Sequence, residues 1–266
     1  MIVVRSILKR VLQQCHAPAA AVEADAQRLV VALDNAPAND RYAIMSLTPG
    51  RAPSGFEPPP STPTDDPVGA WFARAAAFER ASVFAFEHLA CELRAHGAPD
   101  DLVRRALESA DEERVHDALM ASLAHRRGVS VKHIAPPQRA RRPLAAIALE
   151  NMTEGCVRET WSALVACWQA RHCAEGRAST AFRVIADDET RHAQLAWDVA
   201  SWLEPRLDEF TMRRLGRACD HTVTDVVSEA MAEVDPALVI YAGLPSSDDS
   251  LALLAELDAQ LWSHVP

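Results

Sequence analysis

Glycine and long apolar runs are scarce in this sequence. Only 9 of its 266 residues are glycine, which weakens helices more than any residue except proline. No segment stays apolar for the roughly 18 residues that mark a membrane-spanning helix. The sequence therefore predicts no membrane span. Its 49% of hydrophobic residues, rich in alanine and leucine, favour a helical protein with a sizeable core.

Cysteine pairs of the kind that bind zinc are also lacking. None of the six cysteines belongs to a Cys-x-x-Cys motif, and this spacing is typical of free thiols in a reducing compartment. At the N-terminus, Arg5, Lys9 and Arg10 interrupt the apolar residues, so the segment predicts a short amphipathic helix rather than a signal peptide. We therefore expect a cytoplasmic protein.

An excess of positive charge is absent as well. The chain has 27 basic and 37 acidic residues, with a formal net charge of -10 and a pI of about 5.5. No basic stripe marks a nucleic-acid surface, so we expect no nucleic-acid partner. The one basic cluster is interpreted as solvated charge in a loop rather than as a phosphate site. It consists of Lys132, Arg139, Arg141 and Arg142.

Proline divides the N-terminal part of the chain from the rest. Eight of the 17 prolines fall in residues 37–67, a density that excludes a regular helix and predicts a proline-rich linker. Residues 1–36 are predicted to form an N-terminal helical extension, with short helices near residues 2–15 and 20–34.

The remainder of the chain shows helical periodicity of its apolar residues. A bundle is predicted over residues 68–234, and a C-terminal helical tail over residues 235–266 with a helix near 248–262. Short links make the first two and the next two long helices antiparallel pairs, whereas a link of about 15 residues lets the chain cross the bundle. The expected fold is all-α, a four-helix bundle with one long crossover and extra N- and C-terminal helices. The long helices are expected near residues 68–96, 99–127, 144–172, 179–203 and 205–234.

Four of these helices carry acidic residues where an apolar residue is expected. Two helices carry a Glu-x-x-His motif, and the other two carry a glutamate in the apolar stripe. Residues three apart share one helix face, so each motif can present a carboxylate and an imidazole to one ion. Four carboxylates offset the charge of two divalent ions. The predicted metal ligands are Glu79, Glu113, His116, Glu154, Glu189 and His192.

Two details of this site are left open by the sequence. The third helix offers Glu150, Glu154 and Glu159 as ligands. Glu154 lies on the apolar face, and its spacing of 35 residues to the second motif matches the 34 residues of the first pair, so Glu154 is chosen and the others are alternatives. Asp111 and Asp188 are candidates to orient the ligand histidines, with helix-surface charge as the alternative.

The predicted ligands and their flanking runs resemble the ferritin-like superfamily of dinuclear carboxylate proteins, in particular the uncharacterised bacterial ferritin-like domain group. The flanking runs are Glu-Gly-Cys-Val-Arg-Glu-Thr at 154–160 and Asp-Glu-Thr-Arg-His-Ala at 188–193, and the resemblance covers about residues 68–234. It implies a ferritin-like bundle that holds two iron ions, with manganese as the alternative metal.

The sequence lacks features that are typical of individual families within that superfamily, which reduces the number of functions to be expected. A rubredoxin-like module is excluded by the lack of Cys-x-x-Cys motifs. Tyr42 and Tyr241 both lie outside the four core helices, which argues against a radical-generating reductase subunit. Ile185 occupies the position where some oxygenases have a further histidine.

The resemblance implies a redox function. We expect a di-iron carboxylate enzyme, an oxidoreductase that activates dioxygen to oxidise or hydroxylate a small organic substrate, with electrons from a separate donor protein. The alternatives are a ferroxidase, peroxide-scavenging or iron-handling protein, and a non-catalytic helical binding protein. The oligomeric state is left open, with a homodimer as one candidate.

Overall fold

The chain is all-helical throughout the part that the structure describes. The computed structural model describes residues 4–14, 51–53, 56, 64–132, 134–136 and 141–264, and these contain no β-strand. The predicted all-α class is therefore confirmed. The predicted helix at 20–34 lies outside the described residues. No helix within these ranges is both long and apolar enough to cross a membrane.

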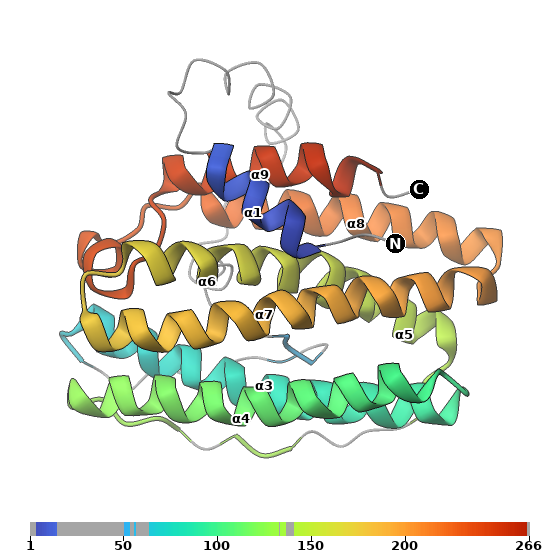
Figure 1. Cartoon of the computed structure of the whole chain (residues 1–266), viewed down its shortest axis with the longest axis horizontal. Helices are drawn as coiled ribbons and strands as arrows, with labels where there is room; N and C mark the ends of the chain where they lie inside the picture. Colours follow the sequence, from blue (N-terminus) through green and yellow to red (C-terminus); the bar gives the residue numbers. More distant parts are fainter. Residues whose placement is uncertain are drawn as a thin grey trace.

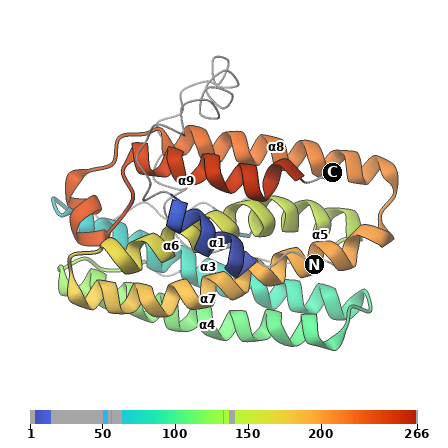
Figure 2. The same ribbon diagram turned by 45° about the horizontal axis from the view of Figure 1, so that its top comes forward.

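Three layers of helices make up the molecule (Figure 1). In that view the lowest layer contains α3 (Pro67–Ala95) and α4 (Asp100–Arg126). The middle layer contains the long helix from Leu144 to His172 and α7 (Gly176–Leu203). The third layer, seen from another side in Figure 2, contains α1 (Val4–Gln14), α8 (Glu209–Ala230) and α9 (Ser247–Gln260). Two short helical turns, Glu204–Arg206 and Leu238–Ala242, flank α8, and a third, Trp262–His264, follows α9.

The first pair of helices begins and ends at residues suited to helix ends. The side chain of Asp66 accepts hydrogen bonds from the backbone amides of Val68 and Gly69, which satisfies two free N–H groups at the start of α3. After α3 and α4 the chain turns at Gly97 and Gly128, whose φ angles of 72° and 73° lie in the left-handed region that favours glycine. The observed ends of the long helices in the first two layers agree with the predicted ones to within three residues.

The long helix of the middle layer is not a uniform α-helix. It consists of α5 (Leu144–Glu150), a π-helical segment η2 (Asn151–Glu159) and α6 (Thr160–His172). In a π-helix the hydrogen bonds run from residue i to i+5, so each residue turns the chain through a smaller angle than in an α-helix. Side chains on the two sides of η2 therefore do not keep the register that a single α-helix would give.

The link between the two pairs crosses the length of the bundle. At its beginning, the Arg127 guanidinium lies 3.1 Å from Asp66, next to the start of α3. At its end, the Arg142 guanidinium lies 2.8 Å from Glu92, near the end of α3, and 2.7 Å from Glu150. Arg142 is thus a half-buried partner of two glutamates, which corrects the interpretation of this one residue as solvated loop charge. Arg141 is exposed, as expected, and Arg139 lies outside the described residues.

The third layer is anchored to the middle layer by polar contacts as well as by packing. The backbone amide of Val4 in α1 donates to the side chain of Gln194 in α7 over 2.9 Å. Trp262, just after α9, donates its indole N–H to the carbonyl oxygen of Cys156 in η2 over 3.1 Å. The described cysteines are free thiols, as the sequence predicted; they are Cys91, Cys156, Cys167, Cys173 and Cys219.

Candidate metal centre

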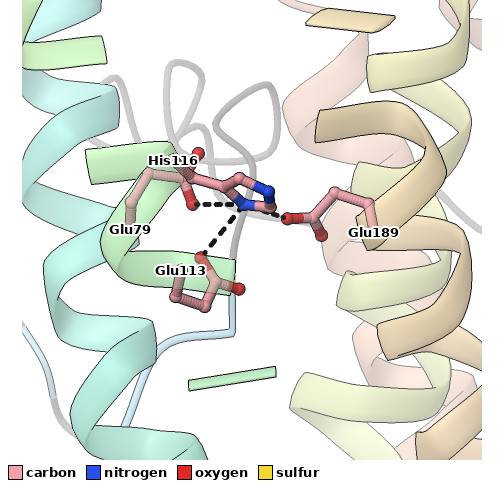
Figure 3. Close-up of side chains that lie close together, drawn as sticks. All are labelled: Glu79, Glu113, His116 and Glu189. Atoms are coloured by element: carbon pink, nitrogen blue, oxygen red, sulfur yellow. Dashed lines mark ion pairs between the residues drawn. The ribbon is translucent and has the colours of Figure 1, made fainter. Parts of the chain in front are cut away.

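A cluster of buried acidic and histidine side chains lies between the first and second layers of helices. Figure 3 shows four of its members, three from α3 and α4 on one side and Glu189 from α7 on the other. Every member has at most 1% of its surface exposed. The cluster contains Glu79, Glu113, His116, Glu159, Glu189 and His192.

The six side chains form two overlapping groups of four. The first group surrounds His116, whose Nδ1 lies 3.5 Å from Glu113, 3.4 Å from Glu189 and 4.0 Å from Glu79. In each group the four candidate ligand atoms lie within 4.8 Å of one another. That spacing allows each group to hold one ion.

The second group surrounds His192 and shares two glutamates with the first. The Nδ1 of His192 lies 3.3 Å from Glu113, 3.6 Å from Glu159 and 3.8 Å from Glu189. Glu113 turns its Oε2 toward one histidine and its Oε1 toward the other. Glu113 and Glu189 therefore belong to both groups.

The cluster lacks the hydrogen bonds that buried polar groups normally make. Among the described residues, all eight carboxylate oxygens of the four glutamates and the Nδ1 atoms of both histidines are buried without a hydrogen-bond partner. Buried polar atoms left without partners are costly, and native proteins contain few of them. Because these ten atoms all belong to one cluster and are all good ligands for divalent ions, the residues fit a metal-binding site.

Two carboxylates outside the cluster fix the orientation of the histidine rings, each from the opposite helix. The Nε2 of His116 in α4 lies 3.0 Å from Asp188 in α7, and the Nε2 of His192 in α7 lies 2.8 Å from Glu112 in α4. Arg191 contacts both of these acids. This arrangement holds the proton on Nε2 and turns Nδ1 toward the cluster, as is usual for histidines that bind metals.

The structure separates the sequence candidates for this role. Asp188 contacts His116 of the cluster, whereas Asp111 forms an exposed ion pair with Arg114. Glu112 was not among the residues predicted from the sequence. A signal for it was present, because an acidic residue directly precedes the glutamate of both Glu-x-x-His motifs.

Glu154, the ligand chosen from the sequence, does not join the cluster. Its carboxylate lies 4.0 Å from the guanidinium of Arg158. Glu159 takes the place in the cluster instead. The reason is the π-helical segment. Each residue of this segment turns the chain through a smaller angle than in an α-helix, so Glu154 and Glu159 do not point in the directions that an α-helix would give them. Glu150, the other alternative, binds Arg142.

Burial and mutual repulsion shift the pKa values within the metal-free cluster. Burial raises the pKa of Glu79 well above its usual range, and the neighbouring Glu113 adds to the shift. Burial also raises the pKa of Glu159, to about 8, although His192 opposes the shift. For His192, burial alone would lower the pKa, but the contacts with Glu112 and Glu113 outweigh burial and raise it well above the ordinary value. The metal-free cluster therefore holds protons near neutral pH.

We expect pH to affect the metal-free and metal-loaded proteins in opposite directions. A glutamate or histidine with a raised folded-state pKa stabilises the fold at low pH, and that contribution is lost as pH rises through the folded-state pKa. The metal-free protein should therefore become less stable between about pH 6 and about pH 8.5, a range that spans the pKa of Glu159. Over the same range metal affinity should increase, since bound ions replace the protons. Urea midpoints with and without Mn²⁺ test this; a parallel change in both forms would contradict it.

Comparison with known proteins assigns neither a family nor a function to the chain. Neither the protein-family models, nor the curated proteins, nor the solved structures yield a match to the chain. The evidence for a function of this chain is therefore the arrangement of the six buried side chains.

Proposed function

We propose that this chain is a ferritin-like dinuclear carboxylate protein that uses two bound iron ions and dioxygen to oxidise or hydroxylate a small organic substrate. One observation carries the proposal: two four-ligand groups share Glu113 and Glu189, so that two ions would lie side by side with bridging carboxylates. The order of helix pair, long crossover and helix pair supports the ferritin-like assignment.

Each ion would have one histidine and three carboxylates as ligands. Oxygen and imidazole donors of this kind suit iron and manganese. When bound, the ion pair supplies electron transfer to dioxygen, a reaction that the side chains of the cluster do not provide. The first ion would be held by Glu79, Glu113, His116 and Glu189, and the second by Glu113, Glu159, Glu189 and His192.

The protein itself contributes orientation and exclusion of water. Asp188 and Glu112 hold the two imidazoles in position, and complete burial keeps bulk water from the ligands. Hydroxylation of a C–H bond by one dioxygen molecule consumes two further electrons and two protons and releases one water. The proposal therefore includes a separate protein that donates electrons. Two earlier expectations, a homodimer and the absence of a nucleic-acid partner, remain predictions.

Metal analysis is the first test of this function. The purified protein is reconstituted anaerobically with Fe²⁺ and its bound iron is measured, together with the variants Glu113→Ala and Glu92→Ala. Glu92 is a matched control, because it is a buried glutamate that pairs with Arg142 outside the cluster. About two ions per chain in the wild type and in Glu92→Ala, with fewer in Glu113→Ala, would support the dinuclear site.

Dioxygen uptake by the iron-loaded protein then separates the functional classes. Uptake that depends on a reductant and is accelerated by an organic compound, which is recovered in oxidised form, would support the proposed oxidation. Dioxygen uptake with Fe²⁺ alone, or consumption of peroxide with Fe²⁺, without an organic substrate would instead indicate a ferroxidase, peroxide-scavenging or iron-handling protein. A wild type that binds no metal would leave a non-catalytic helical protein.

A further inference from the structure

Arg51 is a buried arginine contributed by the proline-rich segment that precedes the bundle. Only 1% of its surface is exposed, and its guanidinium carbon lies 5.9 Å from the ring centre of Phe86 in α3. Its Nη1 donates to the side-chain oxygen of Asn151 in η2 over 3.2 Å, and its carbonyl oxygen accepts from the hydroxyl of Ser82 in α3 over 2.7 Å. A single residue thus connects the first helix of the bundle to the π-helical segment.

These contacts place Arg51 beside the metal ligands. Ser82 follows Glu79 by three residues, which is about one helical turn. Phe86, beneath the guanidinium, has its ring centre 5.0 Å from that of the ligand His192. Arg51 therefore occupies the layer of side chains next to the cluster.

The π-helical segment is shaped to admit the guanidinium. A Cβ atom added to Gly155, four residues before Glu159, would lie 3.0 Å from Nη1 of Arg51 and 2.8 Å from the Cβ of Ala196. The side-chain amide of Asn151 also donates to the carbonyl oxygen of Ala196 over 2.9 Å, four residues after His192. Arg51 and Asn151 together connect α3, η2 and α7, the helices that provide Glu79, Glu159 and His192.

Arg51 makes no close ion pair within the described part of the chain. The one carboxylate there within 4.0 Å of its guanidinium belongs to Glu150, and that carboxylate already accepts hydrogen bonds from Arg142 over 2.7 Å and 2.9 Å. The Nε of Arg51 has no hydrogen-bond partner among the described residues. A well-packed apolar side chain of similar volume would often stabilise the fold at least as well. A guanidinium at this place indicates a role besides stability.

We propose that Arg51 is a positioning residue that closes the metal centre on the side between α3 and η2 and thereby slows the entry and release of divalent ions. Its backbone carbonyl binds Ser82 in α3 and its guanidinium binds Asn151 in the π-helical segment. These two contacts hold the segment against α3 and keep Glu159 facing the other ligands. Without the guanidinium, the vacated space would be lined by polar atoms of Asn151 and would admit water next to the ligands. This inference rests on the proposed dinuclear site, but it concerns ion exchange and not the reaction with dioxygen.

Release of Mn²⁺ to an excess of chelator tests the proposal. The full-length chain is loaded with Mn²⁺, and first-order release is followed well below the unfolding temperature of every variant. Arg51→Ala is expected to release the ions roughly 10-fold faster or more than the wild type, and Arg51→Lys to fall between them, because an ammonium keeps the charge but not the planar set of donors. Arg158→Ala is the matched control. Arg158 is a partly buried arginine of the same π-helical segment that pairs with Glu229 in α8, so its loss should lower stability and leave release unchanged.

The outcomes separate this proposal from the proposed function. Release from Arg51→Ala at the wild-type rate, or equal acceleration in Arg158→Ala, would overturn the role of Arg51 while leaving the metal centre intact. A wild type that binds no Mn²⁺ or Fe²⁺ would overturn the metal centre itself. If Arg51→Ala does not fold, Asn151→Ala removes the acceptor of its Nη1; a release rate equal to that of the wild type would then overturn the proposal.

Discussion

Replacing Glu159 with alanine is expected to reduce the bound metal to about one ion per chain, whereas Glu154→Ala should keep two. Glu159 belongs to the second ligand group and has no exposed surface, but the carboxylate of Glu154 lies next to Arg158 outside both groups. The two residues lie on the same π-helical segment, so each variant is a control for the other. Metal analysis after reconstitution with Fe²⁺ or Mn²⁺ and removal of unbound ions is the measurement.

The opposite result would have an equally clear meaning. If Glu154→Ala lost an ion and Glu159→Ala kept both, the α-helical wheel would describe the ligands correctly. The π-helical segment would then have to rearrange when metal binds. A loss of both ions in Glu159→Ala alone would still support Glu159 as a ligand and would show that the two ions bind cooperatively.

Removing the metal ions is expected to destabilise the protein strongly. Ligands that bind only the folded chain stabilise it by about 4 kcal/mol at a free concentration 1,000 times Kd. For a chain of this size 1 kcal/mol shifts the unfolding midpoint by roughly 2–4 °C, so chelation should lower Tm by on the order of 10 °C. The physical reason is that ten buried ligand atoms lose the ions that would otherwise satisfy them. Calorimetry with Mn²⁺ and with excess chelator measures the difference.

The variant Glu113→Ala provides the control for this difference. Glu113 contributes to both ligand groups, so its loss should weaken both ion positions, and Mn²⁺ should then change Tm little. A wild type whose Tm is the same with metal and with chelator would contradict the expectation. An equal rise in Tm for Glu113→Ala would indicate that Mn²⁺ acts elsewhere on the chain.

The helical fold was predictable because the relevant signals are local. Proline at 67, glycine at 97 and 128, and the apolar periodicity between them define the ends and the buried faces of α3 and α4 within short stretches of sequence. Likewise, the two Glu-x-x-His motifs needed only helical periodicity to be placed on inward faces. Five of the six cluster members were named from such patterns; they are Glu79, Glu113, His116, Glu189 and His192.

The sixth cluster member, Glu159, was named from the sequence only as an alternative to Glu154, because the same reasoning favoured Glu154. Helical periodicity assumes a constant rotation per residue, and the π-helical segment between Asn151 and Glu159 breaks that assumption. The spacing argument failed as well, because the two pairs are not equal in length: 34 residues separate Glu79 from Glu113, whereas 30 separate Glu159 from Glu189. The role of Arg51 could not be predicted for another reason. Its partners Ser82 and Asn151 lie 31 and 100 residues further along the sequence, so no local pattern indicates these contacts.

The π-helical segment also makes the two ligand groups structurally unlike. Glu79 projects from a regular α-helix, whereas Glu159 is the last residue of a segment whose backbone hydrogen bonds run from residue i to i+5. Each ligand group also has one glutamate that the other group lacks, Glu79 in the first and Glu159 in the second. The near-repeat of the two helix pairs thus encloses an asymmetric cluster, in which one of these glutamates comes from an α-helix and the other from a π-helix.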